Sequence, residues 1–183
     1  MKKVHLDWNR VQSLTQEICR QMACDQWRPD YVVGLTRGGL TPAVMISQYL
    51  QVPMHTLKVS LRDAAGDCES NLWMAEEAFG YVQAEDRGET VVHSSESMRK
   101  KILIVDDIND SGATMAWIKD DWEASCAGIA APDIWQQVWG NTVRFAVLVN
   151  NEASHFRDIN YQAMSVNKND EPQWIEFPWE QWW

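Results

Sequence analysis

Hydrophobic positions recur with a helical spacing near the start of the chain. Over residues 8–23 the apolar side chains fall at steps of three and four, at Trp8, Val11, Leu14, Ile18 and Met22. This spacing places them on one face, so it predicts an amphipathic helix. Further helices are expected at 40–50, where a proline near the start is tolerated, and from Met115 to Trp122. A helical turn is expected at 133–139.

Continuous apolar runs predict buried strands between these helices. They stand at 31–35, 54–61, 101–105, 142–149 and, more briefly, 161–166. Strands that alternate with helices indicate a mostly parallel sheet with helices on both faces. The sequence therefore predicts an α/β fold.

In two segments the hydrophobic positions follow neither a helical nor a strand pattern clearly. Residues 62–100 are rich in Asp, Glu, Ser and Gly, with one candidate helix at 72–84, and residues 126–140 are mostly irregular. The first segment is expected to leave the core, either as a flap over a site or as a surface insertion. The length of 183 residues fits a single domain over 1–183, with a core at about 28–166.

Composition narrows the class of protein. No apolar run approaches the ~20 residues that a membrane span needs, and no apolar stretch follows the first lysines. The four cysteines form no CxxC pair, which is typical of reduced thiols in a cytoplasmic protein. A net charge of −10 opposes nucleic-acid binding, because such proteins usually carry a basic face. It does not oppose a small anionic ligand that arrives with a metal ion.

The richest chemistry lies in residues 102–114, ILIVDDINDSGAT. Ligands of open parallel sheets bind beyond the carboxyl ends of the strands, and Asp106 and Asp107 follow the expected strand directly. Residues 110–114 are small and lead into a helix, so their N–H groups can cradle an anion. Carboxylates accept hydrogen bonds from hydroxyls. A sugar phosphate offers both groups, and Mg²⁺ would offset negative charge.

A second strand, turn and helix repeat this arrangement at YVVGL-TRGG-L. Gly38 and Gly39 allow close approach of the backbone to an anion, and Arg37 is suited to pair with a phosphate. Two cradles at one sheet edge suggest a ligand with phosphates at both ends. Taken alone, a glycine pair is also typical of a tight turn, and an aspartate pair of a cap. The ordered string at 102–114 distinguishes a site from these alternatives.

ILIVDDINDSGAT resembles the phosphoribosyl-diphosphate-binding motif of type I phosphoribosyltransferases. VVGLTRGGLTP looks like the diphosphate loop of that family. EPQWIEFPWE, at 171–180, is similar to the base-binding hood of xanthine-guanine and hypoxanthine phosphoribosyltransferases. The resemblance implies a parallel sheet flanked by helices and a small C-terminal hood, at about 167–183 with the N-terminal segment.

The activity that the resemblance implies is the transfer of a 5-phosphoribosyl group to a purine-like nitrogenous base, with release of diphosphate and with Mg²⁺ as cofactor. It also implies a homo-oligomer, as a dimer or tetramer. Carboxylates near the sugar would stabilise the oxocarbenium character that develops at C1. A flap within 62–100 would exclude water.

The resemblance also implies roles for single residues. Phosphoribosyl diphosphate would be held by Arg37, Gly38, Gly39, Asp106, Asp107, Asp110, Ser111, Gly112, Ala113 and Thr114. Asp110 would be the catalytic residue that handles the ring-nitrogen proton of the base. Trp174 would stack on the base, and the Ile175 backbone would meet its edge. Asp107 and Glu180 would bind the metal. An equally good interpretation is that Glu180 is a solvent-exposed glutamate of the C-terminal tail.

One position departs from the family. In the enzymes that act on 6-oxopurines, a lysine just after the fourth core strand usually contacts the exocyclic oxygen of the base. Here Asn150 or Asn151 takes that place, and an amide lacks the charge. We therefore expect Asn151 to meet the base, and a base other than guanine, xanthine or hypoxanthine.

Two alternative interpretations of the sequence predict other functions. KKILIVDD also resembles the start of a response-regulator receiver, but such a domain needs a phosphoacceptor aspartate at the end of a later strand, and FAVLVNN ends in asparagines. A non-catalytic sensor of phosphoribosyl diphosphate with the same fold stays open, because a fold alone does not fix activity. The presence of Asp110 favours the enzyme.

Overall fold

The computed structural model describes residues 2–59, 71–86, 89–126 and 133–181. In chain order the elements are β1 (Lys2–His5), α1 (Trp8–Cys24), β2 (Tyr31–Thr36), α2 (Leu40–Leu50), β3 (Met54–Lys58), α3 (Leu72–Phe79), β4 (Tyr81–Asp86), β5 (Glu89–Ser94), η1 (Glu96–Met98), β6 (Ile102–Asn109), α4 (Ala113–Ser125), α5 (Asp133–Val138), β7 (Val143–Asn151), β8 (Tyr161–Val166), β9 (Gln173–Glu176) and η2 (Pro178–Glu180).

A five-stranded sheet in the order β3-β2-β6-β7-β8 forms the centre of the molecule. Every neighbouring pair in it is parallel, which confirms the predicted α/β class and mostly parallel sheet. The chain steps from β2 outward to β3, then returns to the other side of β2 and continues through β6, β7 and β8. Strand order therefore reverses between β2 and β6, and such a switch point is where open sheets bind their ligands.

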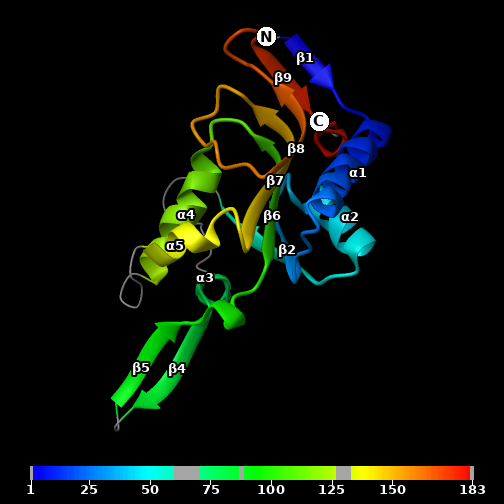
Figure 1. Ribbon diagram of the computed structural model, residues 1–183. Coiled ribbons are helices and arrows are strands. Elements are labelled where there is room, and N and C mark those ends of the chain that lie inside the picture. The colour runs from blue at the N-terminus through cyan, green and yellow to red at the C-terminus, as the bar shows by residue number, and fades with distance from the viewer. Residues whose placement is uncertain (1, 60–70, 87–88, 127–132, 182–183) are drawn as a thin grey trace.

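Helices cover both faces of this sheet, with α1 and α2 on one face and α3, α4 and α5 on the other (Figure 1). Successive side chains of a strand point to opposite faces. In β6, Leu103 and Val105 accordingly pack in the cluster with α1 and α2, whereas Ile102 and Ile104 pack in the cluster with α4. All four side chains are fully buried. Burial on both faces is why this strand reads as an uninterrupted apolar run.

An antiparallel hairpin, β4 with β5, projects away from the body of the molecule (Figure 1). The candidate helix at 72–84 is correspondingly shorter than expected, because α3 ends at Phe79. Gly80 follows in the left-handed conformation with a φ of 72°, which turns the chain into the hairpin. Residues 62–70 and 87–88 of the expected flap, and residues 127–132 of the expected irregular segment, lie outside the described residues.

A second small sheet joins the two ends of the chain, because β1 pairs in parallel with β9. Sequence periodicity predicted neither strand. Lys2 Nζ lies 2.7 Å from a Glu171 oxygen, and Lys3 Nζ lies 3.4 Å from a Glu176 oxygen. The N-terminal strand thereby borders the segment that carries Trp174. None of the described helices has the length and apolar content that a membrane crossing requires.

Candidate active site

A crevice opens where β2 and β6 part. The two strands pair only as far as Gly34 and Val105. Beyond that point β2 continues beside β3, and β6 continues beside β7 to Asn109. The expected strand end at Val105 is therefore wrong, because pairing with β7 extends β6 by four residues. Asp106 and Asp107 belong to this extension, so they line the crevice as residues of the strand and not of the loop that follows it.

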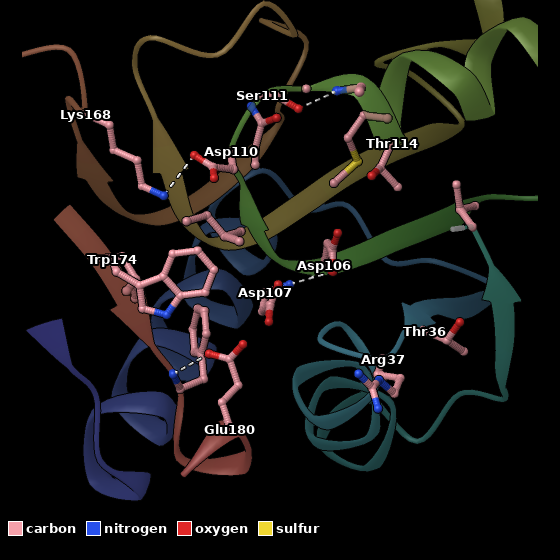
Figure 2. Close-up of a pocket in the computed structure, with 18 of the residues that line it drawn as sticks. Thr36, Arg37, Asp106, Asp107, Asp110, Ser111, Thr114, Lys168, Trp174 and Glu180 are labelled. Carbon is pink, nitrogen blue, oxygen red and sulfur yellow. Dashed lines mark hydrogen bonds and ion pairs between the residues drawn. The ribbon is translucent and has the colours of Figure 1, made fainter. Parts of the chain in front are cut away.

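The crevice is a cavity of about 860 Å³, which is within the usual size of small-molecule sites. Most of the sequence-predicted site residues line it: Arg37, Asp106, Asp107, Asp110, Ser111, Gly112, Ala113, Thr114, Trp174, Ile175 and Glu180. They come from the β2–α2 loop, β6, the start of α4, β9 and η2, so segments far apart in the sequence converge here (Figure 2). Gly38, Gly39 and Asn151 are not among the lining residues.

The loop at 110–114 leads into α4 through a glycine that no other residue can replace without strain. Gly112 has a φ of 89°, and a Cβ there would lie 2.5 Å from the Phe156 amide nitrogen. As the residue before the helix, it offers no side chain to cap the first amide groups. The first turn of α4 lines the cavity and the Ala113 amide is 3.4 Å from Ser111 Oγ. This helix start is suited to bind an anion.

The two glycines of the β2–α2 loop lie behind the cavity wall. A Cβ on Gly38 would lie 2.1 Å from Asp107 Oδ2, and one on Gly39 would lie 2.1 Å from the Val105 carbonyl oxygen. Their absent side chains let this loop sit against β6 and leave room for the Asp107 carboxylate. The peptide bond between Thr36 and Arg37 is cis, and both of these residues face the cavity.

Negative charge is concentrated on the β6 side of the cavity. Burial, followed by the neighbouring Asp107 charge, raises the pKa of Asp106 well above its usual range. Burial and the charge of Glu180 raise the pKa of Asp107 to about 6. The Asp107 amide donates to Asp106 Oδ1 over 3.0 Å. These acids repel one another, so a cation or a hydroxyl donor placed among them would be stabilised.

Glu180 reaches this acidic group from the C-terminal end of the described chain. Its Oε2 accepts from the Phe177 amide at 2.9 Å, which holds the side chain over the cavity with its carboxylate toward Asp107 (Figure 2). The described residues contain no group of three or more His, Cys, Asp or Glu side chains around one metal position. Mg²⁺ usually takes only one or two carboxylates and completes its shell with water and phosphate oxygens. The pair formed by Asp107 and Glu180 fits that habit.

The structure brings a cation to the site that sequence reasoning missed. Lys168, in the loop between β8 and β9, lines the cavity, and its Nζ lies 2.9 Å from Asp110 Oδ1 (Figure 2). The position after the fourth core strand holds asparagines, as expected, but Lys168 supplies a cation to the same cavity from another segment. Lys58, at the end of β3, also lines the cavity. Neither lysine belongs to a recognisable motif, because each reaches the site only through the path of its loop or strand.

Asn151, expected to meet a base, is buried beneath the cavity wall. Its Nδ2 donates to the Asp110 carbonyl oxygen at 3.0 Å and lies 3.3 Å from Asp110 Oδ1. Its Oδ1 accepts from the amides of Ala153 and Lys168, each at 3.1 Å. A direct contact of Asn151 with a base has no support in this geometry, because its amide is already engaged by neighbouring residues.

Trp174 and Ile175 belong to β9, whose partner is the N-terminal strand. Trp174 lies opposite Lys3 in the register and is 38% exposed, whereas Ile175 is buried opposite Val4. Both residues line the cavity. A partly exposed indole at a cavity wall can stack on a planar ring.

Comparisons with known proteins agree with this geometry. Residues 6–181 match the family described as the phosphoribosyl transferase domain. Xanthine phosphoribosyltransferase 1 of Saccharomyces cerevisiae is 25% identical over 132 residues, which make up 69% of this chain and 63% of the yeast protein. The chain thus matches less than two thirds of that relative's length. Xanthine-guanine phosphoribosyltransferase of Vibrio parahaemolyticus is 26% identical over 168 residues, covering 81% of this chain and 96% of the relative.

A solved structure shares the fold. The crystal structure of a purine phosphoribosyltransferase from Pyrococcus horikoshii superposes with a TM-score of 0.60 and 20% identity, over 100% of this chain and 96% of the other. The family match spans nearly the whole sequence and includes every residue of the cavity. The chain therefore belongs to the phosphoribosyl transferase family, as the motif at residues 102–114 implies.

Proposed function

We propose that this chain transfers a 5-phosphoribosyl group from phosphoribosyl diphosphate to a purine base and releases diphosphate. The observation that carries the proposal is the meeting of three parts in one cavity at the switch point of the sheet. These parts are the acidic pair of β6, the anion-binding start of α4 and the indole of Trp174. Each suits one part of the two substrates: hydroxyls, phosphate and planar base.

The sugar phosphate would bind along β6 and the loop that follows it. Asp106 and Asp107 accept hydrogen bonds from the two ribose hydroxyls, and the amides of residues 110–114 hold the 5′-phosphate. Arg37 faces the diphosphate from the β2–α2 loop, where a guanidinium can bind two phosphate oxygens. The base lies against Trp174.

In the reaction, the bond between C1 of the ribose and the diphosphate oxygen breaks, and the diphosphate leaves with the bonding electrons. A ring nitrogen of the base forms the new bond to C1. Asp110 accepts the proton that the base loses from another ring nitrogen. Between these events C1 carries positive charge, which the carboxylates of β6 stabilise.

We propose Mg²⁺ as the cofactor, held by Asp107 and Glu180. When bound, the ion would neutralise part of the diphosphate charge and so favour its departure. Its protein ligands would be oxygens only, as Mg²⁺ prefers. Burial and the neighbouring charge of Glu180 raise the pKa of Asp107, so a cation held between these carboxylates would be stabilised.

Turnover tests the proposal. The protein is incubated with phosphoribosyl diphosphate, Mg²⁺ and a panel of bases, and released diphosphate is measured. We expect base-dependent release, and we expect Asp110→Asn to lower it by ~10²–10⁴-fold while binding of phosphoribosyl diphosphate persists. Binding without release for any base would contradict the enzyme and support the sensor of the same fold.

We also propose a homo-oligomer, on the basis of the family alone. Light scattering coupled to gel filtration measures the assembled mass. A monomer at micromolar concentration would contradict this.

A further inference from the structure

We propose that Trp179 is a positioning residue: its indole N–H bonds the Asp107 carboxylate once phosphoribosyl diphosphate is bound, and it holds that carboxylate in the orientation that meets the ribose hydroxyl. This inference rests on the proposed function, because it assumes the role given there to Asp107. Trp179 is not among the described residues that line the cavity, so it would reach the ligand only through Asp107.

The first observation is a buried donor without an acceptor. Trp179 Nε1 is enclosed by protein, and no described residue accepts a hydrogen bond from it. The great majority of buried polar side-chain atoms in native proteins are bonded, so an unbonded one needs an explanation. Such a donor is available to a neighbouring acceptor that changes its orientation when a ligand binds.

The neighbouring acceptor is Asp107. Burial and the charge of Glu180 raise the pKa of Asp107 to about 6, whereas the indole of Trp179, as a nearby donor, acts in the opposite direction. The indole and the carboxylate are therefore close, although in the free protein they do not form a hydrogen bond of regular geometry. A rotation of the carboxylate would complete this bond.

The second observation is that the Trp179 ring is held by aromatic neighbours. Its ring stacks on that of Phe177, with centroids 4.9 Å apart and planes 7° from parallel. The ring of Trp8, the first residue of α1, lies 6.0 Å away at an interplanar angle of 56°. Contacts of these two kinds restrict the orientation of an aromatic ring. The direction of the indole N–H is thus set by the protein and does not depend on the ligand.

The third observation is the turn that carries Trp179. Glu180 closes this turn twice, because its amide donates to the Phe177 carbonyl oxygen at 3.0 Å and its Oε2 accepts from the Phe177 amide at 2.9 Å. Trp179 and Glu180 are adjacent in the sequence, and both act on Asp107. One short segment therefore brings to the same carboxylate a like charge and a hydrogen-bond donor.

A purely structural role of Trp179 would have different consequences. If the indole only packed η2 against α1, its loss would disturb the whole C-terminal segment, including Trp174 of β9. Binding of the base and binding of phosphoribosyl diphosphate would then both weaken. A residue that acts through Asp107 should affect phosphoribosyl diphosphate and spare the base.

The direct test follows the indole N–H of Trp179 by nuclear magnetic resonance in the ¹⁵N-labelled full chain. Its signal is the one absent from Trp179→Phe, and Trp179→Tyr serves for the same assignment. We expect the signal to move downfield when phosphoribosyl diphosphate and Mg²⁺ are added, because a new hydrogen bond deshields the proton. A signal that keeps its position in the saturated complex would overturn the proposal.

Titration calorimetry measures the effect on binding. Trp179→Phe keeps an aromatic ring and removes the N–H, so phosphoribosyl diphosphate with Mg²⁺ should bind about 10–100-fold more weakly, the usual range for a hydrogen bond to a charged group. KM for the base should stay within about twofold. In an Asp107→Asn background the same substitution should weaken binding by less than about threefold, because the charged acceptor is already gone.

Trp135→Phe is the matched control. Trp135 Nε1 is also buried without a partner among the described residues, and its ring stacks on Trp139 at 5.2 Å and 20°. Trp135 lies in the hydrophobic cluster on the other face of the sheet and does not line the cavity. Its substitution should leave the affinity for phosphoribosyl diphosphate unchanged. A loss equal to that in Trp179→Phe would overturn the specific role of Trp179.

The outcomes separate the two proposals. Undiminished binding of phosphoribosyl diphosphate by Trp179→Phe, or an equal weakening for this ligand and for the base, overturns the role of Trp179 while the proposed function stands. Failure of the wild type to bind phosphoribosyl diphosphate contradicts the proposed function itself, and this inference falls with it.

Discussion

The carboxylates of Asp107, in the central strand β6, and Glu180, in the last described turn, face each other across the cavity (Figure 2). After burial, the charge of Glu180 is the main reason why the pKa of Asp107 rises to about 6. Like charges held together in this way are costly for the free protein and useful for binding a cation or a hydroxyl-rich ligand. The fold thus gives up stability to create a site.

This relationship predicts how the stability of the free protein depends on pH. The pKa of Asp107 is about 6 in the folded state against 3.8 for an ordinary aspartate, so the folded state binds the proton more tightly between these values. Stability should therefore fall as pH rises from about 4 to 6, by on the order of 1–2 kcal/mol after allowance for screening. Thermal melting at closely spaced pH values measures this.

Asp107→Asn removes the titrating group, so it should raise the melting temperature at pH 7 by a few degrees and flatten the pH dependence. It should also abolish the strengthening of phosphoribosyl diphosphate binding by Mg²⁺. A melting temperature at pH 7 below that of the wild type would contradict the repulsion.

Gly38→Ala should disturb the acidic pair, Asp106 and Asp107, although neither aspartate is substituted. The new Cβ would lie 2.1 Å from Asp107 Oδ2, so the carboxylate must move. We expect binding of phosphoribosyl diphosphate to weaken by about tenfold or more, as measured by calorimetry, because the ribose hydroxyls lose a charged acceptor. Gly140→Ala is the control, since Gly140 has a φ of 77° and its Cβ would meet no atom nearer than 3.6 Å. That control should cost stability but not binding.

Trp174→Ala should affect the base and spare the sugar phosphate. Stacking on an indole contributes about 1–3 kcal/mol per base, so KM for the base should rise by about 5–150-fold. KM for phosphoribosyl diphosphate should change little. Trp73→Ala serves as the control, because Trp73 is 42% exposed, comparable with the 38% of Trp174, but does not line the cavity. Equal effects of both substitutions on the base would remove Trp174 from this role.

Glu176→Ala should weaken the pairing of β1 with β9, the strand that carries Trp174. Glu176 contacts both Lys3 and His5 of β1, and its side chain is only 14% exposed. We expect KM for the base to rise a few-fold while KM for phosphoribosyl diphosphate is maintained. Glu171→Ala removes a pair with Lys2 in which both side chains are more than half exposed, and such pairs contribute little. If Glu171→Ala changes KM for the base as much as Glu176→Ala does, the proposed role of Glu176 in holding β9 against β1 is contradicted.

The sequence predicted the parts of the site that are contiguous. The apolar run of β6, the two aspartates and the small residues before α4 stand in order along the chain, and local chemistry places them at one end of a strand. Continuous apolar runs were sufficient to predict the strands of the central sheet, and the helical spacing of apolar residues was sufficient to predict α1.

The parts that pattern could not predict depend on partners distant in the sequence. Asp106 and Asp107 belong to β6 because the pairing of this strand with β7 continues to Asn109, and β1 is a strand because β9 lies beside it. Lys168 reaches Asp110 through a loop whose path no local spacing reveals. Asn151 stands where the resemblance expects a lysine, but the structure uses its amide to connect two loops.

The central claim is that one cavity binds the whole phosphoribosyl group, and its most direct test is a crystal structure with phosphoribosyl diphosphate and Mg²⁺ bound. We predict the 5′-phosphate at the amides of residues 110–114 and the ribose hydroxyls within hydrogen-bond distance of Asp106 and Asp107. Density for the ligand elsewhere on the molecule, or a sugar turned away from both aspartates, would contradict the account.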